Sequence, residues 1–303
     1  MFKKITVSAL CIILLTALLP VSASADMGPK PSVVIDFSGL SGETYYATLL
    51  SSVESTGPHS ALSYHKRDNP DLDDIALYIG AERDDPVFMK FLEYQDTDGY
   101  FFLMFLQNCS ETHRFSWTYY PPQNFKILLY FPARDSFVVA GPFERYAFDS
   151  YYSATISSNV QPNTVNYDLM DVSRSYDYLG ETLSLAARII LTIALELLIA
   201  LMFVFRKKKQ IQLILVVNLV TQIALNVALN IINFNHGSMA FVFAFILLEF
   251  AVFIIEAILY TVLMSKLSNT QVPKWKTITY ALVANTASFA AGLGLAYVIP
   301  GIF

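Results

Sequence analysis

Apolar residues form long continuous runs in the last third of the chain. Each run has about 20 residues or slightly more, which as a helix crosses the ~30 Å hydrocarbon layer of a bilayer. Short polar stretches separate the runs, which are residues 186–205, 211–232, 240–264 and 277–299. The pattern predicts an all-α, four-helix transmembrane domain over residues 186–303.

Residues 26–156 show a different pattern, in which short β-branched and aromatic runs alternate with turn signals. "VFMKFLEY" and "YFFLMFL" flank the turn sequence "QDTDG" (95–99), and "FKILLYF" and "SFVVAG" flank "PARD" (132–135). Such runs joined by hairpin turns are typical of strands. We therefore predict an all-β sandwich, Ig-like or similar, over residues 26–156, followed by a linker over residues 157–185.

The N-terminus has the layout of a secretory signal peptide. "MFKK" is basic, "ITVSALCIILLTALLP" is apolar, and "VSASA" supplies small residues for cleavage after Ala25. The alternative is an uncleaved anchor helix. Cleavage of residues 1–25 would remove Cys11 and leave Cys109 as the only cysteine, so the exported β domain is expected to have no intrachain disulfide.

The two halves of the chain differ in charge. Residues 26–180 carry about twice as many acidic as basic residues, whereas the basic residues of the second half gather in 206–210 and 265–276. The stretch 233–238 has no Lys or Arg. The positive-inside rule places the two basic loops in the cytoplasm, so residues 26–185 and the C-terminus are expected outside a bacterial cell membrane. The acidic exported domain argues against nucleic acid as a partner.

Every predicted span carries polar side chains near its centre. A charge at that depth costs from ~2.5 to more than ~10 kcal/mol, so these side chains are expected to face one another and not lipid. The hypothetical intramembrane polar site consists of Glu196, Asn218, Gln222, Asn226, Glu249, Glu256, Asn285 and Ser288. Two interpretations remain open: the polar groups hold the helices together, or they bind a proton, an ion or a small solute.

The helical half also contains an internal repeat. Glu196 and Glu256 each precede a basic residue by ten positions, and each basic loop is followed by Leu-Val-x-Asn, which aligns Asn218 with Asn285. Duplication of a helical hairpin would produce this pattern, as in transporters built from parallel repeats. It would bring both Glu–Asn pairs to a shared axis.

Candidate chemistry in the exported half is sparse. "SWTYYPP" (116–122) suggests an exposed aromatic surface for sugars or peptides, although such residues are also common in cores; the surface would consist of Trp117, Tyr119 and Tyr120. The acidic stretches 68–74 and 96–99 lack the full calcium-loop pattern and are interpreted as solvated turns. No metal-ligand spacing or nucleophile motif occurs, so we predict no metal, no cofactor and no enzymatic activity.

Several strings resemble a group of predicted membrane proteins of Gram-positive, Clostridia-like bacteria. They include "DMGPKPSV", "TYYATLLSS", "WTYYPPQNFKILLYFP" and "YAFDSYY" in the exported half, and "VNLVTQIALN" and "ANTASFAAG" in the spans. The resemblance covers most of the chain. It implies the same layout and a bacterial plasma-membrane location, but no functional residues, because the group has no assigned activity.

Two functions are compatible with these patterns. The first is a multi-pass cell-surface sensor or envelope-interaction module, whose exported domain binds a cell-wall component, a peptide or a protein. The second is a small proton- or cation-coupled transporter or channel that uses the intramembrane carboxylates and is expected to work as a homodimer. An intramembrane hydrolase is the poorest fit, because the His and Cys sets that metal or thiol chemistry requires are missing.

Overall fold

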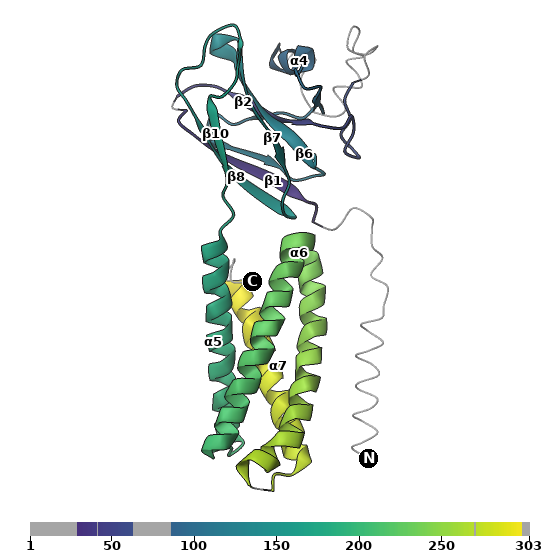
Figure 1. Ribbon diagram of the computed structural model, residues 1–303, viewed down its shortest axis with the longest axis vertical. Helices are drawn as coiled ribbons and strands as arrows, with labels where there is room; N and C mark the ends of the chain where they lie inside the picture. The colour runs from purple at the N-terminus through teal and green to yellow at the C-terminus, as the bar shows by residue number, and fades with distance from the viewer. Residues whose placement is uncertain (1–28, 41, 63–85, 270, 299–303) are drawn as a thin grey trace.

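The computed structural model describes residues 29–40, 42–62, 86–269 and 271–298, with side chains described up to residue 292. A β domain lies at one end of a set of long helices (Figure 1). The predicted signal peptide and the acidic stretch 68–74 lie outside the described residues.

The first sheet of the β domain has the strand order β10-β8-β1-β5. Its strands are β1 (Ser32–Ser38), β5 (Arg114–Trp117), β8 (Asp149–Ile156) and β10 (Met170–Arg174). β1 runs antiparallel to β5 but parallel to β8, so the sheet is mixed.

The second sheet has the order β3-β2-β6-β7-β9, with β4 also paired to β2. Its strands are β2 (Tyr46–Ser51), β3 (Phe101–Phe102), β4 (Gln107–Asn108), β6 (Asn124–Phe131), β7 (Ser136–Glu144) and β9 (Val165–Asn166). The predicted hairpin around "PARD" is confirmed, because β6 and β7 pair antiparallel across the short 3-10 helix Pro132–Arg134. β7 and β9 are parallel, which makes this sheet mixed as well.

Alternate residues of facing strands fill the space between the two sheets. In β1 the buried apolar residues recur with the period of two that a strand imposes, and β6 supplies a second row. These core residues are Val33, Ile35 and Phe37 of β1 and Phe125, Ile127, Leu129 and Phe131 of β6. This mixed core of aliphatic and aromatic side chains stabilises the domain, and Cys109 is buried within it as a free thiol.

The prediction of an all-β, Ig-like sandwich was wrong in two respects. The segment predicted as a strand in "VFMKFLEY" forms helix α4 (Pro86–Glu93), and both sheets contain parallel pairs. Phe88, Phe91 and Leu92 lie on one helical face because they are spaced three and four residues apart. This face covers the outer side of the second sheet, where Leu128 and Tyr130 of β6 are also apolar. A sheet that is apolar on both faces needs a second cover, and α4 supplies it.

Part of the predicted linker also belongs to the β domain. Within residues 157–185, strand β10 pairs antiparallel with β8 and strand β9 pairs with β7. Polar side chains outnumber apolar ones there because both strands lie at sheet edges, where one face meets solvent.

The prediction of four transmembrane helices was wrong, because the described chain has three long helices after the β domain. They are α5 (Tyr178–Met202), α6 (Lys208–Ser268) and α7 (Lys274–Val298). The second and third predicted spans both belong to α6, since the stretch between them stays helical except at Gly237, where φ is 79° and ψ is 179°. At this bend α6 turns back, so that its two arms, 208–236 and 238–268, lie beside each other (Figure 1).

Helices α5 and α6 are each long and apolar enough to cross a membrane. Large apolar side chains are exposed on their outer surfaces, among them Leu198, Leu247 and Phe250. The polar side chains within these helices are mostly buried instead. An arrangement that is apolar outside and polar inside is the one expected of helices in lipid.

Candidate functional site

Two carboxyl groups are fully enclosed by the helices. Glu196 of α5 and Glu256 of α6 have no exposed surface. Both lie among side chains from all three helices, and they are close enough to interact electrostatically with each other. The structure therefore brings together two of the carboxyls that the sequence predicted to face inward.

Glu256 accepts hydrogen bonds on both of its carboxyl oxygens. The Thr221 hydroxyl donates to Oε1 at 2.7 Å, and the Asn285 amide donates to Oε2 at 2.8 Å. Thr221 comes from the first arm of α6 and Asn285 from α7, so a single carboxyl connects three helical segments. Hydrogen bonds across membrane helices are each worth ~0.6 kcal/mol, and this geometry provides two of them.

A layer of tyrosines that the sequence analysis missed lies next to these carboxyls. The Asn218 amide donates to the Tyr260 hydroxyl at 3.0 Å, and the Tyr280 hydroxyl donates to the backbone carbonyl of Glu196 at 3.3 Å. Both tyrosine rings are fully buried, and their centroids are 5.4 Å apart. The position of Tyr260, one helical turn after Glu256, was the signal that could have revealed it.

Glu196 has a different environment from Glu256. Among the described residues, neither of its carboxyl oxygens has a hydrogen-bond partner, and the side-chain oxygen of Asn218 lacks one as well. Asn218 nevertheless lies close enough to interact with the Glu196 carboxyl. The two Glu–Asn pairs of the sequence repeat are thus not equivalent, since only the pair of Glu256 and Asn285 forms a hydrogen bond of normal geometry.

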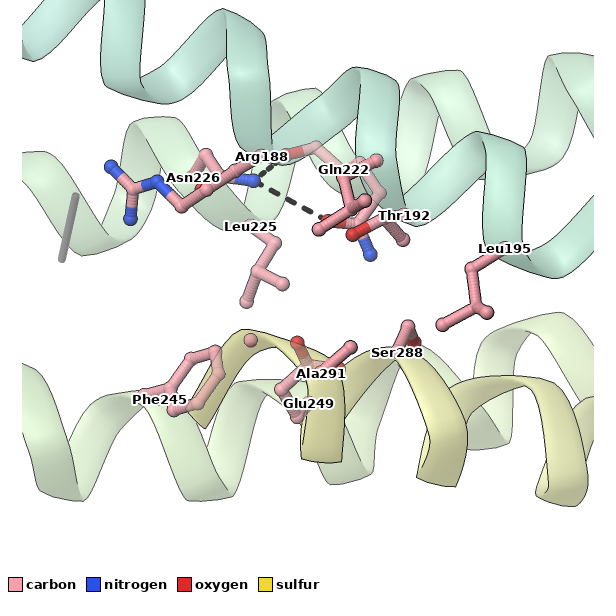
Figure 2. Close-up of a pocket in the computed structure, with 12 residues that line it drawn as sticks. Arg188, Thr192, Leu195, Gln222, Leu225, Asn226, Phe245, Glu249, Ser288 and Ala291 are labelled. Carbon is pink, nitrogen blue, oxygen red and sulfur yellow. Dashed lines mark hydrogen bonds between the residues drawn. The ribbon is translucent and has the colours of Figure 1, made fainter. Parts of the chain in front are cut away.

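The remaining predicted polar residues line a small cavity of about 30 Å³ between α5, both arms of α6 and α7 (Figure 2). Its polar lining consists of Arg188, Thr192, Gln222, Asn226, Glu249 and Ser288. The Asn226 amide donates to the Gln222 backbone carbonyl at 2.8 Å, and the Ser288 hydroxyl donates to the Asn285 carbonyl at 3.1 Å. The cavity is therefore separate from the Glu256 cluster, but connected to it through α7.

The predicted aromatic surface of the β domain is not a single patch. Trp117 lies in the core with 1% of its surface exposed, and its indole nitrogen donates to the carbonyl of Tyr119 at 2.9 Å. Only Tyr120 is well exposed, and the Lys30 ammonium lies 5.4 Å from its ring centroid. Trp117 therefore cannot contact a ligand at the surface.

The acidic turn at residues 96–99 binds a cation supplied by the chain itself. Lys126 Nζ lies 2.8 Å from Asp96 Oδ2 and 2.6 Å from Asp98 Oδ2, and the side chains of Lys126 and Asp96 are almost completely buried. Burial alone would lower the pKa of Lys126, but its hydrogen bonds to Asp96 and Asp98 raise the pKa above its ordinary value. Within the described residues, no group of three or more His, Cys, Asp or Glu could hold a metal ion.

The β domain contacts the bend of α6 directly. The backbone amide of Phe148, just before β8, donates to the carbonyl of Phe234 at 2.8 Å. The Tyr146 and Tyr176 ring centroids lie 6.3 Å and 5.4 Å from that of Phe234. A Cβ at Gly237 would come within 2.5 Å of the Phe148 ring, so only glycine allows this approach.

A cleft of about 500 Å³ opens beside this contact, between the β domain, the start of α5 and the bend of α6. Arg114 forms a bidentate ion pair with Asp36 at 2.6 Å and 3.0 Å on one side of it. Tyr151, Tyr176 and Glu181 also line the cleft. A molecule bound here would touch the β domain and both helices together.

No protein-family model, curated protein or solved structure matches this chain.

Proposed function

We propose that the protein is a multi-pass cell-membrane sensor whose exported β domain binds a component of the cell envelope. The observation that carries this proposal is the contact of the β domain with the bend of α6, through the Phe148–Phe234 hydrogen bond and the close approach at Gly237. A simple anchor needs one span and no such contact. A domain fixed to the bend of a long membrane helix can transmit a change in its own position to that helix.

The proposed topology follows from the charges and the length of α6. A helix of 61 residues is about 90 Å long at 1.5 Å per residue, so α6, folded at Gly237, crosses the bilayer twice. α5 brings the chain to the cytoplasmic side, where α6 begins. The basic stretches before α6 and around its C-terminal end lie opposite the β domain (Figure 1), and the positive-inside rule favours the cytoplasm for them.

Cysteine labelling in intact cells tests this topology. In a variant without native cysteines, Asn235→Cys at the bend of α6 should react with a membrane-impermeant maleimide. Lys208→Cys at the start of α6 should react only after the cells are permeabilised. Labelling of Lys208→Cys in intact cells would contradict the proposed orientation.

We propose the cleft beside the α6 bend as the ligand-binding surface, because it is the place where binding would change the contact between β domain and helices. The test is co-sedimentation of the full-length protein with purified cell-wall sacculi. Tyr151→Ala in the cleft should weaken binding, whereas Tyr120→Ala should not; both side chains are 39% exposed, which makes them a matched pair. Equal binding by wild type and Tyr151→Ala, or no binding at all, counts against the proposal.

A second candidate function is proton or cation transport, which is favoured by the enclosed carboxyls and the polar cavity. It is tested by flux into vesicles containing wild type, Glu196→Gln, Glu249→Gln or Glu256→Gln. Wild-type flux that disappears in a folded variant would make transport the better account, and a homodimer would then be expected. Absence of flux in the folded wild type leaves the sensor proposal in place.

A further inference from the structure

The cavity between the helices contains unsatisfied hydrogen-bonding groups of both kinds. Gln222 is 97% buried and lines the cavity, and among the described residues its side-chain nitrogen has no acceptor. Glu249 lines the same cavity, and its buried oxygen Oε2 has no donor among them. Figure 2 shows Gln222 and Thr192 on one side of the cavity and Glu249 and Ser288 on the other.

The size and chemistry of the cavity fit water. A cavity needs about 10–15 Å³ to hold one water molecule, so about 30 Å³ accommodates about two. A buried water also needs two to four polar partners. Here an amide donor, a carboxyl acceptor and the hydroxyls of Thr192 and Ser288 line the space. Water is both donor and acceptor and satisfies both unpaired atoms, whereas a metal cation would leave the Gln222 donor unpaired.

We infer that this cavity is a hydrated site in which water joins Gln222 to Glu249, so that Glu249, unlike Glu256, exchanges protons with water in the cavity. Glu256 is fully buried and already accepts hydrogen bonds from Thr221 and Asn285 on its two oxygens. Glu249 lines the cavity and keeps one oxygen for water. The inference goes beyond envelope sensing and does not depend on a ligand for the β domain.

The charged groups around Glu249 come from two helices. α5 contributes Arg188 at the cavity wall and Glu196 within electrostatic range. α6 contributes Glu256, two turns further along the same arm. The α7 residues that line the cavity, which include Ser288, carry no charge. Proton uptake at Glu249 therefore changes the charge next to two other carboxyls and one guanidinium.

Infrared spectroscopy of the full-length protein in lipid vesicles tests the inference. The carboxyl C=O band that disappears in Glu249→Gln should change with bulk pH and shift promptly on transfer to D2O. The band that disappears in Glu256→Gln should respond more slowly. Gln222→Met keeps the side-chain size but removes the amide, and it should slow exchange at Glu249 roughly threefold to tenfold, the value of one lost hydrogen bond.

Circular dichroism establishes that each variant remains folded, and Gln222→Met provides the test if Glu249→Gln does not fold. Equal exchange at Glu249 and Glu256 would overturn the inference. So would unchanged exchange in Gln222→Met, or a Glu249 band that responds to neither pH nor D2O.

Discussion

Both halves of the molecule enclose a carboxyl group, but they satisfy it differently. In the β domain, Asp96 is bound by the Lys126 ammonium at 2.8 Å and 2.9 Å. Between the helices, Glu256 is bound by the Thr221 hydroxyl and the Asn285 amide. An ion pair requires the carboxyl to stay charged, whereas a hydroxyl can either donate or accept. The β-domain cluster is therefore suited to a carboxylate that stays charged, whereas the neutral side chains of Thr221 and Asn285 can bind the Glu256 carboxyl in either protonation state.

The largest effect is expected from Lys126→Met in the β domain. The change leaves Asp96 buried without its cation, which should cost about 3 kcal/mol of unfolding free energy. Denaturant unfolding of the full-length protein, followed by labelling of the Cys109 thiol, measures it. Burial raises the pKa of Cys109 to about 12, so this thiol should stay unreactive until the domain opens.

Lys90→Met is the matched control for that change. Lys90 pairs with Asp135, and the two side chains are 40% and 46% exposed. Its loss should cost no more than about 1 kcal/mol. Similar losses of unfolding free energy in the two variants would contradict the expectation that the buried ion pair stabilises the domain more than the exposed one.

A smaller loss of unfolding free energy, about 2 kcal/mol, is expected from Gly237→Ala at the bend of α6. Alanine at a φ of 79° is strained, and its Cβ would meet the Phe148 ring. Protease susceptibility at the bend should rise. The double variant with Phe148→Ala should relieve the ring contact but not the backbone strain, and Asn235→Ala serves as a nearby control. Unchanged protease susceptibility at the bend in Gly237→Ala would contradict the proposed packing of Gly237 against Phe148.

Thr221→Val should have a more modest effect on the helices. It removes the donor to Glu256 Oε1, at a cost of about 0.6 to 1.7 kcal/mol, measured by unfolding of the protein in detergent. Thr221→Val should cost a different amount of unfolding free energy in Glu256→Gln than in wild type, because the two side chains are in contact. Strict additivity would mean that the Thr221–Glu256 contact contributes nothing.

The smallest effect concerns pH in the β domain. Because the pKa of Lys126 is raised in the folded protein, its stabilisation is complete below the ordinary lysine pKa of about 10.4. It is lost as the pH rises through the folded value. The stability advantage of wild type over Lys126→Met should therefore shrink only at strongly alkaline pH. An advantage that shrinks on acidification through pH 7 would contradict this linkage.

The spacing of apolar residues predicted strands and long helices, but not helix α4 or the bend within α6. The β6–β7 hairpin was predicted, because strands with apolar residues flank an obvious turn. Helix α4 was missed, because eight residues of apolar sequence fit a strand or a helix equally well. The helical bend at Gly237 was mistaken for a loop, since its conformation depends on contact with Phe148, far away in the sequence.

In the candidate site too, the local pattern predicted which residues are buried, whereas contacts between distant segments could not be predicted. Membrane depth and charge cost predicted that Glu196 and Glu256 face inward, as the structure has them. The choice of partner could not be predicted, because Thr221 and Asn285 reach Glu256 only through the packing of three segments. The burial of Trp117, which the sequence left open, could not be predicted because local sequence does not reveal which face of a strand is covered.

The coupling of the β domain to α6 is tested most directly by hydrogen–deuterium exchange of the full-length protein in lipid nanodiscs, with and without cell-wall fragments. Binding should change exchange at the α6 bend in wild type and change it less in Phe148→Ala, which lacks the ring packed against Gly237. Fragments that bind without changing the bend in wild type, or that change it equally in Phe148→Ala, would contradict the account.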